Sequence, residues 1–345
     1  MLNLEHNGLL YIAAFACSFG ISLVMTPVAK KISQKLGAID YPKARGMHKE
    51  PIPRMGGLAI VSGFLVTVLI ILPFLPELRT IQFVGFVGGM VIIVLLGMLD
   101  DVYTLSAKYK LLIQIIAALI VISTGTAIHV ELPFIELSGR LDAPVTLVWI
   151  IGVTNAVNLI DGVDGLAAGV SAISALCIMA LCLMGENYMA AVYTTLLAGS
   201  CLGFLPRNFS PAEIIMGDTG STFLGFVLAV SSILGVYKSY AVLSVAIAML
   251  ALALPIFDTV FAMLRRALSG KPIMEADRGH LHHRLIDSGY SHKKAVVLLY
   301  LISAVAAALA ILIAIHNAAT AVAIIASIVI GLMMIFIYNK RLDKK

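Results

Sequence analysis

The sequence has 345 residues, of which 60% are hydrophobic and 12% are charged, and its formal net charge is +5. An ordinary soluble domain is roughly 25% charged, so this composition excludes a soluble globular fold and indicates a membrane protein. Nucleic acid is not expected as a partner, because the basic residues lie in short loops beside apolar blocks, where they are typical of membrane topology.

Apolar blocks follow one another along the whole chain, and a block of about 20 such residues can cross a bilayer as a helix. They predict an all-α polytopic membrane protein with about 11 transmembrane helices in one domain, residues 1–345. The blocks lie near 9–29, 55–76, 81–99, 110–128, 144–160, 165–184, 188–205, 220–236, 239–264, 294–315 and 318–338. With the N-terminus outside and the C-terminus cytoplasmic, 21 of the 24 lysines and arginines lie inside, as the positive-inside rule requires.

The first two polar motifs lie in the loop before the second block and at the end of the third. The loop GAIDYPKARGMHKEPIPRMGG carries His48 and Arg54, which either anchor it at the lipid surface or contact a ligand. Asp100 and Asp101 end the third block, and Lys110 opens the fourth. Adjacent carboxylates repel each other, so the pair either binds Mg²⁺, accepts a proton from a phosphate nucleophile, or forms a solvated helix end with lysine partners.

The fifth block runs into the motif TNAVNLIDGVDGLAAG. Its Asn155, Asn158 and Asp161 recur at i, i+3 and i+6, near one face of a helix, and Asp164 follows. Polar residues at membrane depth are costly unless they are paired or face a water-filled cavity, so the cluster indicates a site. The alternative is a set of hydrogen bonds between helices.

Asp218 lies in a GDTGS turn that opens the eighth block, ten residues after Asn208. An Asp in this position is either a helix N-cap or a ligand for Mg²⁺ beside a helix N-terminus that favours phosphate.

The loop after the ninth block reads ADRGHLHHRLID and carries three histidines between two arginines. This spacing matches no zinc motif, and the arginines favour binding of a diphosphate. A surface loop with incidental histidines is the alternative. The candidate ligands are Arg278, His280, His282 and His283.

In combination, the motifs DD, NAVNLIDGVDGLAAG, PAEIIMGDTGS and HLHH resemble the polyprenyl-phosphate N-acetylhexosamine-1-phosphate transferase family over about residues 40–287. The resemblance implies an all-helical fold with a cytoplasmic active site in the bacterial plasma (inner) membrane. It implies transfer of N-acetylglucosamine 1-phosphate from UDP-N-acetylglucosamine to undecaprenyl phosphate with release of UMP, initiating a cell-envelope polysaccharide such as teichoic acid.

The histidine run bears on the branch of the family. HLHH followed by Arg284 is similar to the TagO/WecA-type branch, which uses N-acetylglucosamine. The MraY-like phospho-N-acetylmuramoyl-pentapeptide transferases, with three adjacent histidines after a proline, are the alternative. The exact N-acetylhexosamine, the length of the lipid chain and the downstream polymer stay open.

Roles follow from the resemblance, residue by residue. Asn158 and Asp218 match the ligands of Mg²⁺, for which Mn²⁺ is a possible substitute, while Asp164 and Asn208 match contacts to the uridine base. Lys110 matches a phosphate-contacting lysine and joins the paired aspartates, whose role is that of a base or of a phosphate-positioning pair. The expected catalytic residues are Asp100, Asp101 and Lys110, and the expected substrate-binding residues are Asp161, Asp164, Asn208, His280, His282, His283, Arg278, His48 and Arg54.

A cation-coupled membrane transporter is the alternative from another functional class, because acids inside a membrane can bind a coupling cation. Asp258 in the ninth block most resembles such an acid, although we expect it to be an internal polar partner. The other acids cluster at predicted inner helix ends, and no inverted repeat is found, which favours the transferase. The expected partners are UDP-N-acetylglucosamine, undecaprenyl phosphate and the bilayer, and a homodimer is left open.

Overall fold

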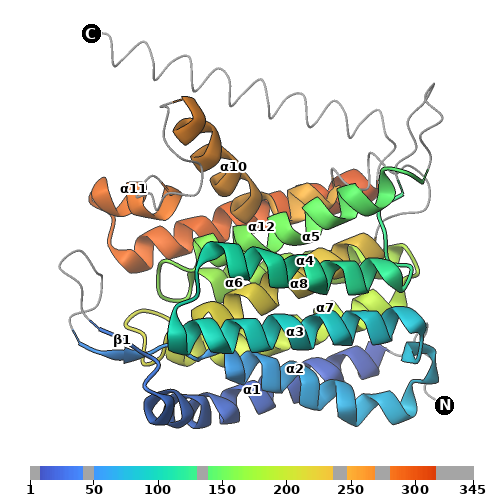
Figure 1. Ribbon diagram of the computed structural model, residues 1–345, viewed down its shortest axis with the longest axis horizontal. Helices are drawn as coiled ribbons and strands as arrows, with labels where there is room; N and C mark the ends of the chain where they lie inside the picture. The colour runs from blue at the N-terminus through green and yellow to red at the C-terminus, as the bar shows by residue number, and fades with distance from the viewer. Residues whose placement is uncertain (1–7, 42–49, 130–138, 236–246, 269–279, 316–345) are drawn as a thin grey trace.

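The computed structural model describes residues 8–41, 50–129, 139–235, 247–268 and 280–315, and these form a bundle of long helices with one two-stranded antiparallel sheet (Figure 1). The elements are α1 (Gly8–Leu36), β1 (Ile39–Asp40), β2 (Ile52–Pro53), α2 (Gly57–Ile71), η1 (Leu72–Phe74), η2 (Pro76–Leu78), α3 (Ile81–Tyr103), α4 (Ala107–Ser123), α5 (Asp142–Ile160), α6 (Leu166–Met184), α7 (Tyr188–Asn208), α8 (Gly217–Leu234), α10 (Ala253–Leu268), α11 (Leu281–Asp287) and α12 (His292–Ile315).

Eight helical segments in the described residues are long and apolar enough to cross a membrane: α1, α2 with η1, α3, α5, α6, α7, α8 and α12. This confirms an all-α polytopic membrane protein. α4 has 17 residues and is slightly shorter than each of these eight segments. The predicted span at 318–338 lies outside the described residues, so the number of 11 spans and the sides of the termini stay predictions.

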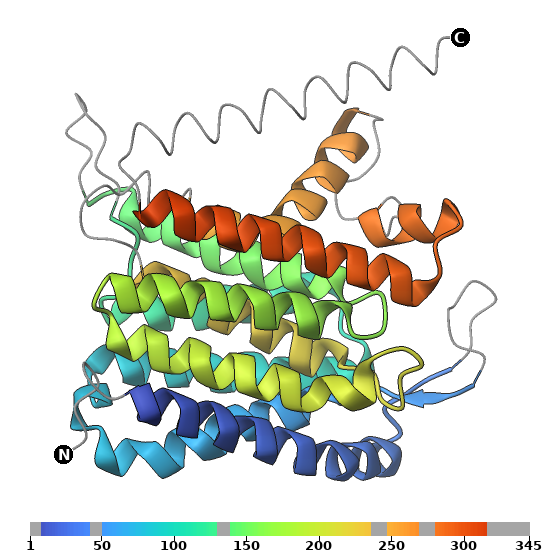
Figure 2. The same cartoon turned by 180° about the vertical axis from the view of Figure 1, so that it is seen from behind.

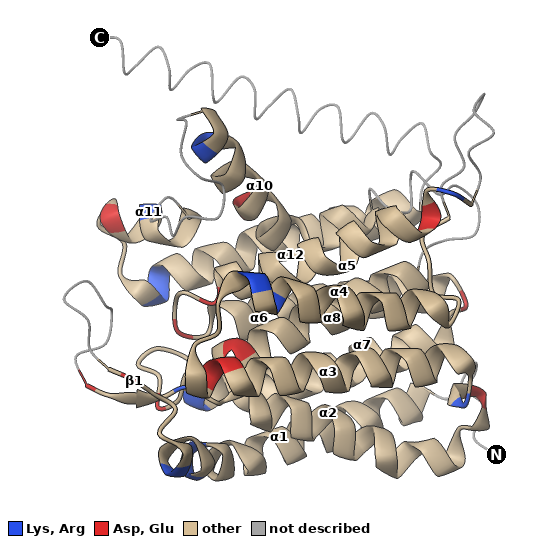
Figure 3. Cartoon of the chain, in the orientation of Figure 1, with Lys and Arg blue, Asp and Glu red and all other residues tan. Residues whose placement is uncertain are grey.

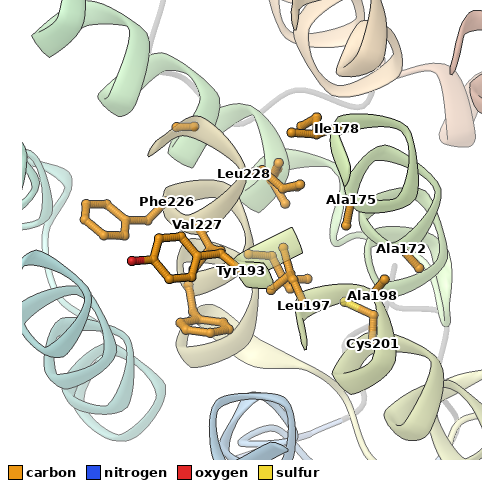
Figure 4. Close-up of a cluster of buried hydrophobic side chains, with 14 of the residues drawn as sticks. Ala172, Ala175, Ile178, Tyr193, Leu197, Ala198, Cys201, Phe226, Val227 and Leu228 are labelled. Atoms are coloured by element: carbon orange, nitrogen blue, oxygen red, sulfur yellow. The ribbon is translucent and has the colours of Figure 1, made fainter. Parts of the chain in front are cut away.

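The bundle has two layers with α8 between them. Figure 2 shows α1, α7, α6 and α12 side by side, whereas α3, α4 and α5 form the opposite face and α2 closes one edge. The sequence of α8 is apolar or small on all sides, which is typical of a helix surrounded by others. Figure 4 shows Tyr193 and Leu197 of α7 packed with Phe226 and Val227 of α8.

Close helix contact brings α3 against the start of α8. A side-chain carbon added at Gly97 would lie 2.5 Å from the Cα atom of Thr219, so only glycine lets the two backbones meet here. In lipid there is little hydrophobic driving force between helices, so their association depends on close packing, which small residues at the interface allow. This contact fixes the first turn of α8 beside the last turns of α3.

Charged residues are concentrated at one end of the bundle, which we call the polar end (Figure 3). The helices alternate in direction, so α1, α3, α5 and α7 end there and α2, α4, α6 and α8 begin there. The described loops assigned to the inner side therefore share this end, as the charge pattern predicts. The opposite end carries Arg79 and Arg140.

The structure differs from the prediction at the ninth span, which was expected to run through residues 239–264. Residues 239–246 of this span lie outside the described residues, and residues 247–251 are helical. After a turn at Leu252, the helix α10 begins at Ala253 and projects away from the bundle (Figures 1 and 2). Pro255 has no N–H to donate to the carbonyl of Ala251, which would be its partner in a continuous helix. The hydroxyl of Ser174 on α6 donates to that carbonyl instead, at 2.8 Å.

Candidate active site

Asp101 binds the beginning of α8 to the end of α3. Its carboxylate accepts hydrogen bonds from the backbone N–H of Asp218 (2.9 Å) and Thr219 (3.0 Å), and from the Thr219 hydroxyl (2.6 Å). Arg54 donates through Nε at 3.2 Å. These donors include N–H groups that a helix leaves without partners in its first turn, so the buried carboxylate of Asp101 acts as a cap for α8.

The turn before α8 needs glycine at position 217. Gly217 has a φ of 75°, and a side-chain carbon there would lie 1.9 Å from the Arg54 carbonyl oxygen and 2.6 Å from the Asp101 carboxylate. Arg54 is itself held by a hydrogen bond from its backbone N–H to the Ser33 hydroxyl, at 3.1 Å. The loop that carries Arg54 is thus fitted against the GDTGS turn.

Lys110 joins the second carboxylate of the pair to Asp218. Its Nζ atom lies 2.5 Å from Asp100 Oδ2 and 2.6 Å from Asp218 Oδ2. Asp100 Oδ1 accepts from the backbone N–H of Leu105 at 2.6 Å. The guanidinium of Arg54 lies 3.7 Å from Asp218 Oδ1. We call Asp100, Asp101, Asp218, Lys110 and Arg54 the carboxylate cluster.

Asn158 lies beside the same turn of α8, whereas Asn155 does not. The amide oxygen of Asn158 accepts a hydrogen bond of 2.6 Å from the Ser221 hydroxyl. Asn155 pairs with Gln114 of α4 through two amide hydrogen bonds of 2.8 and 3.3 Å. The alternative of hydrogen bonding between helices therefore applies to Asn155, whereas Asn158 lies near Asp218, beside the first turn of α8.

Asp161 follows the end of α5 and has no hydrogen-bond partner for its carboxylate among the described residues. Burial, and then the negative charges of Asp218 and Asp101, raise the pKa of the Asp161 carboxyl to about 8. This part of the site therefore has an excess of negative charge that a cation would offset.

The donor chemistry fits Mg²⁺, which prefers carboxylate and amide oxygens. The oxygens available are those of Asn158, Asp218 and Asp161. No group of three or more His, Cys, Asp or Glu side chains is arranged as a metal site in the part of the chain that the structure describes. An ion bound here would need further oxygen ligands from substrate phosphates, as Mg²⁺ commonly does.

Asp164 and Asn208 bind two loops at the polar end to each other. Asn208 is buried, accepts from the Gly165 N–H at 3.1 Å and donates to the Ile214 carbonyl at 3.0 Å. Asp164 accepts from the Ala212 N–H at 3.0 Å. A cavity of about 600 Å³ adjoins these loops, with a lining that includes Lys30, Pro53, Asp164, Ala212, Glu213 and His292.

The histidine run begins at His280, which directly precedes the short helix α11, and continues into the first turn of that helix. Nδ1 of His280 lies 2.9 Å from the Asp258 carboxylate. His282 is buried, and this burial lowers the pKa of its imidazole to about 4, so it is neutral at neutral pH. We therefore expect His282 to act through hydrogen bonding rather than through charge. His283 packs against it, with ring centroids 4.3 Å apart.

The structure thus brings most of the predicted site residues to the polar end, although His48 and Arg278 lie outside the described residues. Thr219 and Ser221, which hold Asp101 and Asn158, were not predicted from the sequence, and neither was Tyr300 of α12. The Tyr300 hydroxyl donates to the Gly165 carbonyl at 2.5 Å. The GDTGS motif contained the first two residues, whereas a single tyrosine in an apolar helix gives no such signal.

Comparisons with known proteins agree on one kind of reaction. Residues 83–236 match the family model described as glycosyl transferase family 4. The chain is 43% identical over 304 residues to the probable undecaprenyl-phosphate N-acetylglucosaminyl 1-phosphate transferase of Bacillus subtilis, covering 87% of this chain and 84% of that protein. It is 36% identical over 317 residues to the decaprenyl-phosphate N-acetylglucosaminephosphotransferase of Mycolicibacterium smegmatis, covering 81% and 76%.

A more distant relative has a similar name. The undecaprenyl-phosphate alpha-N-acetylglucosaminyl 1-phosphate transferase of Escherichia coli K12 is 29% identical over 296 residues, covering 82% of this chain and 78% of that protein.

Proposed function

Because the chain belongs to glycosyl transferase family 4, among polyprenyl-phosphate N-acetylglucosamine-1-phosphate transferases, we propose that it transfers N-acetylglucosamine 1-phosphate from UDP-N-acetylglucosamine to undecaprenyl phosphate and releases UMP. The observation that carries the proposal is the carboxylate cluster, beside Asn158, at the polar end of an apolar bundle. Its position suits a reaction between a lipid phosphate and a water-soluble nucleotide sugar.

In this proposal Asn158 and Asp218 hold Mg²⁺, or Mn²⁺ in its place. The ion would neutralise the charge of the donor diphosphate. Lys110 already bridges two carboxylates, so its ammonium lies where it can bind a phosphate oxygen. Lys110 and Arg54 then stabilise the charge that develops on UMP as it leaves.

Asp100 and Asp101 take different parts in the proposed reaction. Asp101 is occupied by the N-terminus of α8, so it positions Asp218. Asp100 shares Lys110 and lies at the end of the bundle where the acceptor phosphate would arrive. An oxygen of undecaprenyl phosphate attacks the β-phosphorus of the donor, the bond from that phosphorus to the bridging oxygen breaks, and the bridging oxygen leaves with UMP. A phosphate is already a competent nucleophile, so no covalent enzyme intermediate is needed.

The polar end faces the cytoplasm in this proposal, because lysines and arginines favour the inner side of a plasma membrane. The lipid-linked product would initiate a cell-envelope polysaccharide such as teichoic acid. The acids of α1 to α8 lie at helix ends and not in mid-bundle, and Asp258 on α10 is bound by His280 and Leu281, so these acids do not favour the transporter alternative.

The test is to incubate the purified full-length protein with UDP-N-acetylglucosamine, undecaprenyl phosphate and MgCl₂ and to measure UMP. We expect UMP only when lipid and metal are both present, and its loss in Asp218→Ala. Donor specificity is checked by substituting UDP-N-acetylmuramoyl-pentapeptide. A folded protein that releases no UMP from any UDP-sugar would contradict the proposal.

A further inference from the structure

Asp258 is a buried carboxylate with both oxygens in use, and nothing above assigns it a role in the reaction. It lies on α10, and its side chain is 8% exposed. Oδ2 lies 2.9 Å from Nδ1 of His280, and Oδ1 accepts a hydrogen bond of 2.8 Å from the backbone N–H of Leu281. One carboxylate thus holds both an imidazole and the first residue of α11.

This contact selects one form of the His280 side chain. An imidazole nitrogen that faces a carboxylate carries the proton, so Nδ1 of His280 is the donor and Nε2 is the nitrogen that can accept a hydrogen bond from a ligand. Carboxylates that hold histidines in this way fix the orientation of the ring.

The same histidine run lies against the turn that carries Asp161. The rings of His280 and His282 are nearly parallel, at 4° with centroids 5.8 Å apart. Nε2 of His282 is buried with no hydrogen-bond partner among the described residues, and it would lie 2.7 Å from a side-chain carbon added at Gly162. Gly162 directly follows Asp161, so Asp258 is connected to the candidate metal site through two histidines and one glycine.

We propose that Asp258 is a positioning residue for the transferase reaction: it holds His280 with Nε2 placed to accept a hydrogen bond from a hydroxyl of the donor sugar, and it fixes the start of α11 so that His282 packs on Gly162. This inference rests on the proposed function. It concerns Asp258 acting through His280 and assigns Asp258 no contact with substrate.

The experiment compares Asp258→Asn with Asp287→Asn, the same substitution at an exposed residue at the end of α11. An asparagine at 258 still accepts the bond from Leu281, but its amide group can donate to Nδ1 and favours the wrong tautomer of His280. We expect kcat/KM for UDP-N-acetylglucosamine to fall roughly 10- to 100-fold in Asp258→Asn, as for other residues that orient a functional histidine. KM for undecaprenyl phosphate and the thermal midpoint should stay close to those of Asp287→Asn.

A double-mutant cycle with His280→Gln separates positioning from a purely structural role. If Asp258 acts through His280, adding Asp258→Asn to His280→Gln causes no further loss of activity. Losses that multiply would overturn the proposal, and so would unchanged kcat/KM in Asp258→Asn or in His280→Gln. If the unsubstituted protein and Asp287→Asn release no UMP, the proposed function fails and this inference fails with it.

Discussion

Asp100 and Asp101 are neighbours in the sequence, yet their carboxylates have different partners. Asp101 receives hydrogen bonds from two backbone N–H groups and a hydroxyl at the start of α8, and an ion pair from Arg54. Asp100 is bound by Lys110 and by one backbone N–H of the following loop. The contacts of Asp101 maintain the fold of the site. Asp100 holds the ammonium group of Lys110, which can bind a phosphate of the substrate.

This difference predicts that substitution by asparagine mainly lowers stability at position 101 and mainly lowers activity at position 100. Asp101→Asn replaces an oxygen acceptor by a donor that faces N–H groups, so it should lower the free energy of unfolding by about 1–3 kcal/mol. Asp100→Asn keeps an oxygen for Leu105 and should abolish UMP release with a smaller change in stability. Thermal unfolding in detergent and the UMP assay measure both, and equal thermal midpoints for the two variants would contradict the assignment.

Asp161 should reduce stability at neutral pH in protein without added metal. Its pKa is about 8 in the folded protein, against an ordinary value of 3.8, so the folded state holds a proton that the unfolded state has lost. The contribution of Asp161 to the free energy of unfolding therefore decreases as pH rises from about 4 to 8.

We thus expect Asp161→Asn to raise the thermal midpoint of metal-free protein at pH 7.5 and to leave it almost unchanged at pH 4. The same variant should lose UMP release. A midpoint that falls at pH 7.5 would show that the carboxylate has a favourable partner.

At the scale of elements, the sequence predicted the helices well and their interruptions poorly. Long apolar blocks identify spans directly, because lipid requires helices with all backbone bonds made internally. The interruption at Leu252 within the ninth predicted span was not foreseen, because Pro255 was given no weight within an apolar run. The contact that compensates for Pro255 is made by Ser174 to the Ala251 carbonyl, 77 residues later in the chain, and no local pattern reveals it.

The break before α10 gives a prediction for Ser174 on α6, and Ser171 on the same helix provides a control. Ser174→Ala leaves the buried Ala251 carbonyl without a donor and should cost about 1–3 kcal/mol. In Pro255→Ala the new N–H can supply that bond, so the double variant should recover part of the loss. Ser171→Ala is the control, because the buried Ser171 hydroxyl has no hydrogen-bond partner in the part of the chain that the structure describes. Equal changes in thermal midpoint for the two serine variants would contradict this account.

At the scale of the whole molecule, the candidate site could be predicted as a set of residues but not as a geometry. The motifs identified Asp100, Asp101, Asn158 and Asp218 because acids and amides beside apolar blocks are unusual. The sequence did not show that Asp101 caps the helix of Asp218, since the two lie 117 residues apart. Contacts of this kind depend on how the spans pack.

The sidedness of the bundle is testable by cysteine labelling in intact cells. In a Cys17→Ser background, Ser288→Cys beyond α11 should react with a membrane-impermeant maleimide only after the cells are opened. Gly139→Cys in the opposite loop should react at once. The three remaining native cysteines are buried and should stay silent. The reverse pattern would place the polar end outside the cell and would exclude the proposed reaction.

The bond between Asp101 and the start of α8 also has a consequence for biosynthesis. At about 5–20 residues per second, the α8 donors to Asp101 leave the ribosome on the order of ten seconds after it. During this delay Asp101 lacks those donors, whereas Leu105 and Lys110 follow Asp100 within ten residues. The position of Asp101 in the last turn of α3 lets water at the membrane surface solvate its carboxylate, whereas a carboxylate at mid-span would be left in hydrocarbon. The order of synthesis therefore favours a site built at helix ends.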